Sequence, residues 1–320
     1  MSRPDNDWRQ VLGLRSPTED RNPRTEAIDQ LPAADLVRLI MTEDRSVAAA
    51  VELAAGAVAD MVDRAVAAIV GGGRVHYVGS GTSGRLGVLD AVELLPTYDV
   101  GEETVRAHLA GGPSAMMVAV EGAEDDVDAG HELGGSVAAG DLVVGLTASG
   151  RTPFVAGALA GAREAGATTA LVSTNPGAPL ATDVDVAVLV DTGPEVITGS
   201  TRMKAATAQK LVLNTFSTAV MVRLGKTYSN LMIEVRPTNK KLRARTVRML
   251  VQATGKSPET CAAVLEGADG DVRVALVALL SGAEVSTAAL VADGFPPDPR
   301  RVSDPAGVRS AVAVMAEAQV

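Results

Sequence analysis

The stretch HYVGSGTSGRLGVLDAVELLP, residues 76–96, decides the fold because it joins an apolar strand to a helix through a loop of glycines and hydroxyls. Further apolar segments of strand length follow it, with helix-length segments between most of them. Short strands alternating with helices of ten or more residues are typical of a parallel sheet covered on both faces. We therefore predict a doubly wound, mostly parallel α/β domain. Its strands are expected at 75–80, 104–110, 141–149, 167–173 and 184–191, and its helices at 83–95, 113–127 and 153–166.

Other segments flank this predicted sheet. Residues 1–30 are polar, contain prolines and predict a loosely ordered arm, and residues 35–70 have long helical character. A long helix over 201–224 and a basic one over 239–253 precede a small bundle, with amphipathic helices at 257–268, 271–282 and 284–294. We divide the chain into an arm with a helix start (1–45), the α/β domain with its leading helices (46–238) and a C-terminal helical domain (239–320).

The composition excludes several classes of function. The 320 residues carry 29 Lys and Arg against 39 Asp and Glu, a net charge of -10, which disfavours broad attraction to nucleic acid or anionic lipid. One cysteine, Cys261, excludes an internal disulfide, and with three histidines it leaves little for a His/Cys metal site. No apolar leader or membrane span is evident, so we expect a cytoplasmic protein with no metal and no cofactor.

The loop after the first predicted strand is built to hold an anion. Gly79, Gly81 and Gly84 match the dinucleotide pattern GxGxxG, but the second strand is followed by Ala110-Gly111-Gly112, where that fold needs an acidic residue. Ser80, Gly81, Thr82 and Ser83 instead bring hydroxyls to a helix N-terminus, whose free N–H groups attract anions. A lone phosphate fits this loop better than a dinucleotide.

Two later polar clusters also follow strands. Thr147, Ser149, Gly150 and Thr152 repeat the hydroxyl chemistry before a helix, although serine and threonine at such positions often only cap the helix. The cluster 195–204 offers Glu195, Ser200 and Lys204 near the same sheet edge, or is an ordinary helix start with solvated basic residues. We expect the two hydroxyl loops to form a phosphate cradle and the third cluster to contribute to it.

These motifs resemble the sugar-isomerase (SIS) domain and, within it, the N-acetylmuramic acid 6-phosphate etherase family. The resemblance spans most of residues 71–245, and its run from Glu195 to Leu242 is the most specific part. Glucokinase regulatory proteins share some of the motifs, but they contain two SIS domains and this chain has room for one. The matching stretches are GSGTSGRLGVLDAVELLPTY, AVEGAED, ASGRTPFV, STNPG, EVITGSTRMKAATAQKLVLNTFST and GKTYSNLMIEVRPTNKKL.

The resemblance implies a reaction and its residues. The family cleaves the D-lactyl ether of N-acetylmuramate 6-phosphate, giving N-acetylglucosamine 6-phosphate and D-lactate during cell-wall sugar recycling. By motif, Glu93 is the catalytic acid and Glu124 the second carboxylate, acting as the base. The chain has Val92-Glu93-Leu94-Leu95-Pro96 where the family has Ser-Glu-Cys-Pro-Pro, so we expect more apolar, burying surroundings for Glu93. A phosphosugar sensor and an aldose–ketose isomerase remain alternatives that need only part of this machinery.

The spacing of Ser83 and Glu93 adds a geometric expectation. Ten residues of unbroken helix would separate them by about 15 Å, which exceeds the reach of one phosphosugar. Either the helix breaks near Gly87, or Glu93 serves a pocket completed by a second subunit. We expect a homodimer, and in the second case a two-fold axis would place the other copy so that the active site is shared between subunits.

Overall fold

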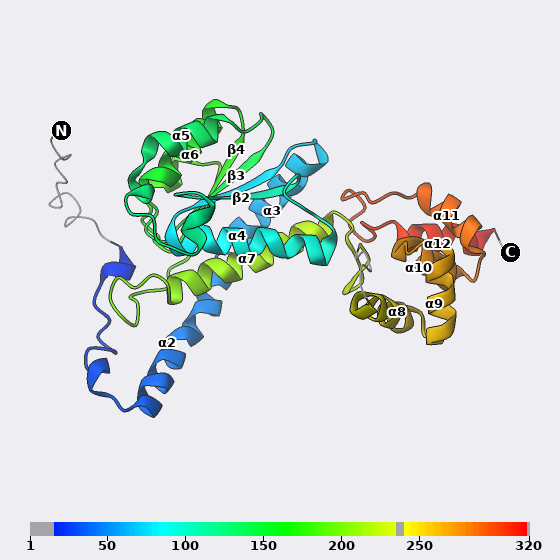
Figure 1. The fold of residues 1–320 in the computed structure, drawn as a ribbon, viewed down its shortest axis with the longest axis horizontal. Helices are drawn as coiled ribbons and strands as arrows, with labels where there is room; N and C mark the ends of the chain where they lie inside the picture. Colours follow the sequence, from blue (N-terminus) through cyan, green and yellow to red (C-terminus); the bar gives the residue numbers. More distant parts are fainter. Residues whose placement is uncertain (1–15, 235–239, 319–320) are drawn as a thin grey trace.

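The computed structural model describes residues 16–234 and 240–318 and has one five-stranded parallel sheet at its centre (Figure 1). The strand order is β2-β1-β3-β4-β5, which confirms the doubly wound α/β prediction. The chain runs from β1 out to β2, crosses back past β1 to β3 and continues outward through β4 to β5. The strands are β1 (Val75–Gly79), β2 (Val105–Leu109), β3 (Leu142–Thr147), β4 (Thr168–Ser173) and β5 (Val186–Leu189).

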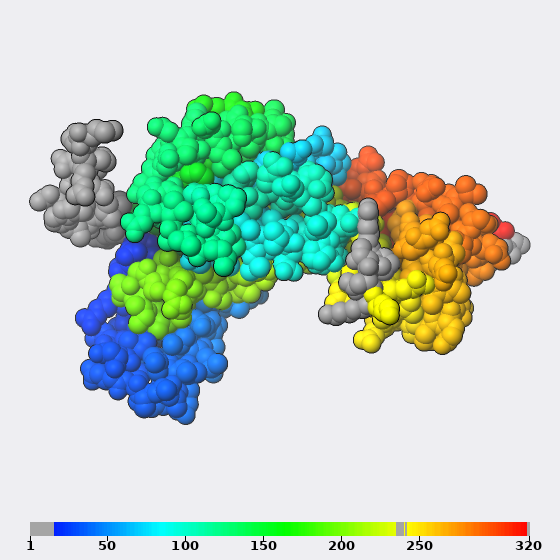
Figure 2. All heavy atoms as spheres, in the orientation of Figure 1, coloured from blue at the N-terminus to red at the C-terminus, as the bar shows by residue number. Residues whose placement is uncertain are grey.

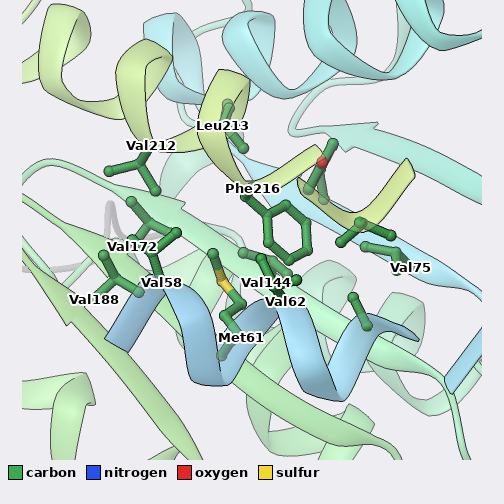
Figure 3. Packing of buried hydrophobic residues seen from close by; sticks show 14 of the residues in the cluster. Val58, Met61, Val62, Val75, Val144, Val172, Val188, Val212, Leu213 and Phe216 are labelled. Carbon is green, nitrogen blue, oxygen red and sulfur yellow. The ribbon is translucent and has the colours of Figure 1, made fainter. Parts of the chain in front are cut away.

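Helices cover both faces of the sheet because alternate strand residues point to opposite sides. Tyr77 and Val144 pack with Met61 and Phe216 into a core beneath α3 (Ala55–Val70), α4 (Gly81–Tyr98) and α7 (Lys204–Arg223). Figure 3 shows Met61 and Phe216 meeting at the centre of this core. Val78 and Val143 face the other way, against α5 (Val127–Gly135) and α6 (Pro153–Glu164).

The predicted helix over 113–127 is wrong. This segment contains only two short 3-10 turns, η3 (Pro113–Met116) and η4 (Ala123–Asp125), and α5 begins after them. Gly122 has a φ of 76°, which ends any continuing helix, and the Asp126 carboxylate accepts a bond from the Ala129 N–H and starts α5. Met117 is 89% exposed, so the segment has no core against which a helix could pack.

The N-terminal segment is more ordered than expected over the residues described. Residues 16–30 form η1 (Pro17–Glu19) and η2 (Ile28–Gln30), and Thr25 donates its hydroxyl to the Val196 carbonyl at 2.8 Å. The loosely ordered arm is therefore wrong for residues 16–30, while residues 1–15 lie outside the described residues. The helical stretch 35–70 is two helices, α2 (Ala33–Leu53) and α3, which meet at Ala54.

The C-terminal bundle has its own apolar core and stands beside the sheet domain (Figure 1). Cys261 is fully buried in it, as a small apolar residue would be. A two-stranded ribbon, β6 (Thr227–Tyr228) with β7 (Leu231–Met232), leads toward it, and Ile233 already packs in its core, so the exact domain boundaries stay predictions. The helices are α8 (Lys240–Thr254), α9 (Pro258–Gly267), α10 (Val272–Ser281), α11 (Val285–Asp293) and α12 (Val308–Glu317).

No single helix in the described ranges is long and apolar enough to cross a membrane. Only α10 and α11 together reach that length and composition, and they are bent by 114° at their junction.

Candidate active site

The two hydroxyl-rich loops leave the sheet side by side. Gly79, the last residue of β1, is paired with Leu146 of β3, so the loops to α4 and α6 emerge from neighbouring carboxyl ends. The strand order reverses between β1 and β3, and ligands of doubly wound sheets bind at this switch point. The two halves of the expected cradle are therefore adjacent.

In the loop after β1, the Ser80 hydroxyl makes no hydrogen bond to the described residues. A Cβ on Gly84 would lie 2.4 Å from the Gly79 carbonyl oxygen, so the glycines allow the start of α4 to contact the strand backbone. Ser80 occupies the N-cap position without a side-chain cap bond. Its Oγ is buried and has no hydrogen-bond partner among the described residues. A buried hydroxyl beside the open N–H groups of a first helical turn is arranged to receive an anion.

The loop after β3 is held by its own hydroxyls. Thr147 Oγ1 lies 2.7 Å from Thr152 Oγ1 and 3.4 Å from Ser149 Oγ, and it accepts the Gly150 N–H at 3.3 Å. Asn175 donates its amide to the Ser149 carbonyl at 2.9 Å. These bonds fix the loop before any ligand arrives.

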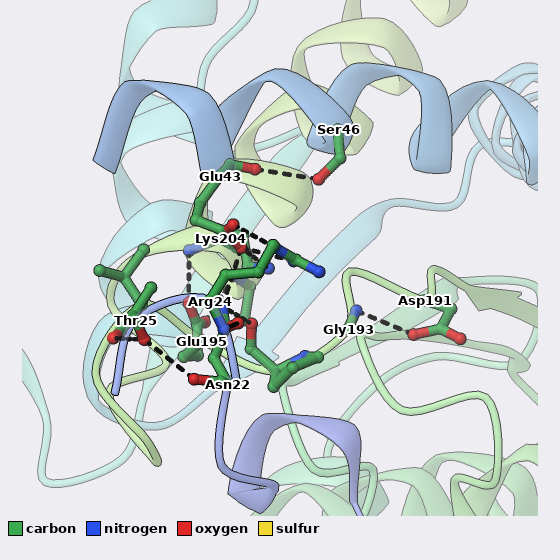
Figure 4. A network of polar contacts seen from close by, with 12 residues as sticks. Asn22, Arg24, Thr25, Glu43, Ser46, Asp191, Gly193, Glu195 and Lys204 are labelled. Carbon is green, nitrogen blue, oxygen red and sulfur yellow. Dashed lines mark hydrogen bonds and ion pairs between the residues drawn. The ribbon is translucent and has the colours of Figure 1, made fainter. Parts of the chain in front are cut away.

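The third polar cluster forms a buried network of its own (Figure 4). The Glu195 carboxylate accepts the N–H groups of Lys204 and Ala205, both at 2.9 Å, and so caps α7. Lys204 is 1% exposed, and its Nζ lies 3.4 Å from Glu43 Oε2. Its ammonium is thus directed toward α2, not presented openly to a phosphate. Ser200, on the loop before α7, is only partly buried.

Glu43 was not expected from the sequence, although it organises this network. It accepts hydrogen bonds from Arg24 and from Asn22, the latter at 2.8 Å. The Arg24 hydrogen bonds lower the pKa of Glu43 to about 2, whereas burial raises the pKa of Glu195. The network ties the N-terminal segment to the start of α7.

Glu93 lies far from the loops of its own chain. The helix α4 runs unbroken from Gly81 to Tyr98, so a break near Gly87 is wrong. A Cβ on Gly87 would lie 2.9 Å from Leu146 Cδ1, and this glycine serves close packing of helix and sheet. Twelve residues separate Gly81 from Glu93, which corresponds to about 18 Å of helix.

Glu93 lines a cleft of about 430 Å³ between α4 and α7. At its floor, Asp90 accepts the Tyr77 hydroxyl at 3.1 Å and pairs with Lys210 Nζ at 3.0 Å. Asp90 was also missed in the sequence, although it lies one helical turn before Glu93 on the same face.

The expected burial of Glu93 by its apolar neighbours is wrong for the single chain. Val92 is 58% exposed and Leu95 56% exposed, and Leu89, one turn earlier, is 43% exposed. Figure 2 shows α4, in cyan, on the outer surface of the molecule. We call Leu89, Val92 and Leu95 the α4 patch. Contiguous apolar side chains of this kind commonly mark an interface.

Glu124 follows the carboxyl end of β2, on the side of the sheet from which the two loops emerge. It lies in η4, which follows β2, and η4 packs against α6. Its side chain is exposed. Glu124 is thus close in the fold to the helix that follows the second loop, while Glu93 is near the opposite end of α4. The structure does not bring the two carboxylates together within one chain.

Comparison with known proteins decides the family. The chain is 58% identical over 268 residues to the N-acetylmuramic acid 6-phosphate etherase of Thermobifida fusca, covering 84% of this chain and 88% of that one. It belongs to the N-acetylmuramic acid 6-phosphate etherase family. A second family member, from Cutibacterium acnes, is 50% identical over 83% of this chain and 88% of its own length. The SIS motifs quoted above are therefore those of an etherase-family enzyme.

Two further similarities concern the sheet domain. Residues 57–163 match the model of the glucokinase regulatory protein N-terminal SIS domain. A phosphoheptose isomerase from Francisella tularensis superimposes with a TM-score of 0.48 at 16% identity, covering 60% of this etherase-family chain and 100% of the isomerase.

Proposed function

We propose that this chain cleaves the D-lactyl ether of N-acetylmuramate 6-phosphate, as a homodimer in the cytoplasm, for recycling of cell-wall sugar. Opening of the pyranose exposes an aldehyde that acidifies the C2 proton. A base removes this proton, the bond from C3 to the lactyl oxygen breaks with protonation of that oxygen, and water adds at C3 of the unsaturated aldehyde. The products are N-acetylglucosamine 6-phosphate and D-lactate. Only proton transfers are required, which two carboxyl groups can perform.

The phosphate would be held by the loops after β1 and β3. Ser80 Oγ and the first N–H groups of α4 would bind its oxygens, while Thr147, Ser149, Gly150 and Thr152 form the wall beside them. The unpartnered Ser80 hydroxyl is the observation that carries this assignment, because a helix-capping role would have used it. Thr82 and Ser83 lie on the same first turn of α4.

Glu124 would act as the base at C2 and Glu93 as the acid for the departing lactate. For the two to meet one substrate, Glu93 would come from a second copy of the chain. The length of α4 supports this sharing, since it separates Glu93 from its own loop by more than the span of one phosphosugar. The α4 patch supports it too, because a two-fold partner packed there would bury the surroundings of Glu93.

The reaction itself is tested by incubating the protein with N-acetylmuramate 6-phosphate and measuring D-lactate. Glu93→Gln is expected to lower the rate about 1000-fold, within the range for loss of a general acid. Glu259→Gln, on the exposed first turn of α9, is the matched control and should keep full activity. Full activity of Glu93→Gln would remove this carboxylate from the mechanism, and absence of lactate from the unmodified protein would refute the function.

Sharing between subunits is tested by mixing two inactive proteins. Glu93→Ala lacks the acid, and Ser80→Asp places a negative charge where the phosphate should bind. After subunit exchange, half of the dimers would be mixed and each would contain one intact site, so about a quarter of the normal activity should return. If mass spectrometry shows exchange and no activity returns, each subunit supplies a complete site.

A further inference from the structure

A second polar pocket lies at the opposite edge of the sheet from the candidate active site. It has a volume of about 270 Å³ and is formed where β1, β2 and β3 begin. His76 and Ser80 are four residues apart on one strand and loop, a distance of about 13 Å. No residue of the proposed cradle lines this pocket. Its side-chain lining comes from Arg74, His76, Arg106, His108, Ser136, Val137, Ala138 and Asp141.

An Asp–His–His chain crosses the pocket floor. Asp141 Oδ2 lies 3.1 Å from His76 Nε2, and His76 Nδ1 lies 2.9 Å from His108 Nε2. The backbone N–H groups of Arg74 and Ala138 also donate to Asp141, at 2.8 and 2.9 Å, and these bonds with His76 lower the pKa of its carboxyl although burial opposes them.

The ionised Asp141 fixes the direction of the chain. It must accept a hydrogen bond from His76 Nε2–H, so His76 Nδ1 accepts a hydrogen bond from His108 Nε2–H. His108 Nδ1 is then left without a hydrogen, and it makes no hydrogen bond to any described residue. One further proton on this pair, which already carries a hydrogen on each Nε2, would place an N–H donor at Nδ1 of His108.

Two arginines, Arg74 and Arg106, line the pocket beside this pair. Arg106 Nε is buried and has no hydrogen-bond partner among the described residues, and its nearest carboxylate, Glu102, is 3.8 Å away. Arg74 lines the mouth of the pocket. Burial, followed by the charges of His76 and Arg106, lowers the pKa of His108 to about 4. The site therefore has two positive charges and an unmet donor, and the ion pair of Arg106 with Glu102 is long and made by an exposed carboxylate.

We propose that this pocket binds a small oxyanion, held by Arg74, Arg106 and a protonated His76–His108 pair. The positive lining suits an ion such as inorganic phosphate, sulfate or a small carboxylate, and the volume admits one. An anion beside His108 would compensate the Arg106 charge, so binding takes up a proton. The assignment does not depend on the reaction at the other edge; only the D-lactate arm of the test refers to it.

Three further carboxylates lie near the histidines. Asp141, directly before β3, is buried and already accepts three hydrogen bonds. Glu102 precedes β2 with its side chain 80% exposed, and Glu103 folds back to accept the Gly101 N–H at 2.9 Å. Neither Glu102 nor Glu103 lines the pocket, so they do not occupy the proposed anion position.

The three histidines of the chain make the test direct, because each gives one ring Cε1–H signal in a spectrum of the full protein. Titration without added anion should give a pKa of about 4 for His108. Saturating sulfate, which does not titrate in this range, should raise it toward the ordinary value of about 6.5. Sulfate affinity should correspondingly increase about tenfold from about pH 7.5 to about pH 5.5. His131, on α5 beside Glu164, is the internal control and should not respond.

Variants separate this site from the cradle and identify the natural anion. Arg106→Gln should abolish the response of His108 to sulfate, whereas Arg38→Gln, an exposed guanidinium on α2, should leave it intact. Sulfate should still act on Ser80→Asp, whose cradle is blocked. Inorganic phosphate and D-lactate, tested separately at constant pH, show which source the site prefers. An unchanged His108 pKa in all three anions, with the protein folded, would overturn the proposal.

Discussion

The loops after β1 and β3 have similar sequences and positions but opposite states of hydrogen bonding. The Ser80 hydroxyl is buried and has no partner within the described part of the chain, whereas the Thr147 and Thr152 hydroxyls bond each other at 2.7 Å. The glycines of the two loops differ in the space around them. A Cβ on Gly81 would meet nothing within 4 Å, but one on Gly150 would lie 2.2 Å from Ala178 Cβ. The loop after β1 is open and has an unused hydroxyl, and the loop after β3 is a packed wall.

This difference indicates how two loops of similar sequence could have different roles in one anion site, one binding the anion and one keeping the geometry fixed. An anion site needs unmet donors, and unmet buried donors destabilise the free protein. Confining them to one loop, while the neighbouring loop is satisfied internally, limits that cost and keeps the geometry fixed. The predictions below follow from this division.

The largest effect is expected from charge placed in the open loop. Ser80→Asp keeps a good N-cap residue, so the free energy of unfolding should change little, but its carboxylate would repel a phosphate. We expect kcat/KM for N-acetylmuramate 6-phosphate to fall about 1000-fold, or about 4 kcal/mol. Steady-state kinetics and urea denaturation of the same preparation measure both quantities.

The matched control is Ser80→Asn, which has nearly the same shape and capping ability without the charge. Its loss should be about tenfold. Equal losses for the Asp and Asn variants would mean that shape, not phosphate charge, is sensed at this position, and the open-loop assignment would fail.

A smaller effect should separate the two glycines. Both have a left-handed backbone, with φ of 52° for Gly81 and 71° for Gly150. Gly81→Ala should cost about 1 kcal/mol of unfolding free energy from this strain alone, whereas Gly150→Ala adds a clash with Ala178 and should cost about 3 kcal/mol. Urea denaturation midpoints would measure the difference.

A second substitution tests the cause of that difference. Ala178→Gly removes the clashing Cβ and should restore part of the stability of Gly150→Ala, while it should lower that of Gly81→Ala further by its own cost. If the two glycine variants are equally stable, the wall is not as tightly packed as its geometry indicates.

The sequence predicts the sheet well because its signals are local. Each strand is a short apolar run, and β1 and β3 are each followed directly by a helix, so the five strands are confirmed. The segment 113–127 fails because helix-forming residues there have no core to cover, and Gly122 takes a left-handed conformation. Position in the fold overrides local preference in that segment.

The site is less predictable because its contacts are not local. Glu43 and Lys204 are 161 residues apart, so no spacing rule brings them together. The roles of Glu93 and Glu124 came from the family resemblance and stay predictions, since the residues alone are ordinary surface glutamates. Asp90 could have been found from its one-turn spacing to Glu93, but nothing in the sequence identifies Lys210 as its partner.

The smallest expected effect decides between capping and binding as the role of the open-loop hydroxyl. If Ser80 capped α4, Ser80→Ala would lower the free energy of unfolding by about 1 kcal/mol. Its Oγ makes no cap bond, so we expect no loss of stability and a rise in KM. Thr152→Val, which removes a real hydrogen bond in the wall, should instead cost about 1 kcal/mol. Equal destabilisation by the two variants would show that Ser80 is a structural residue and that the loops do not differ.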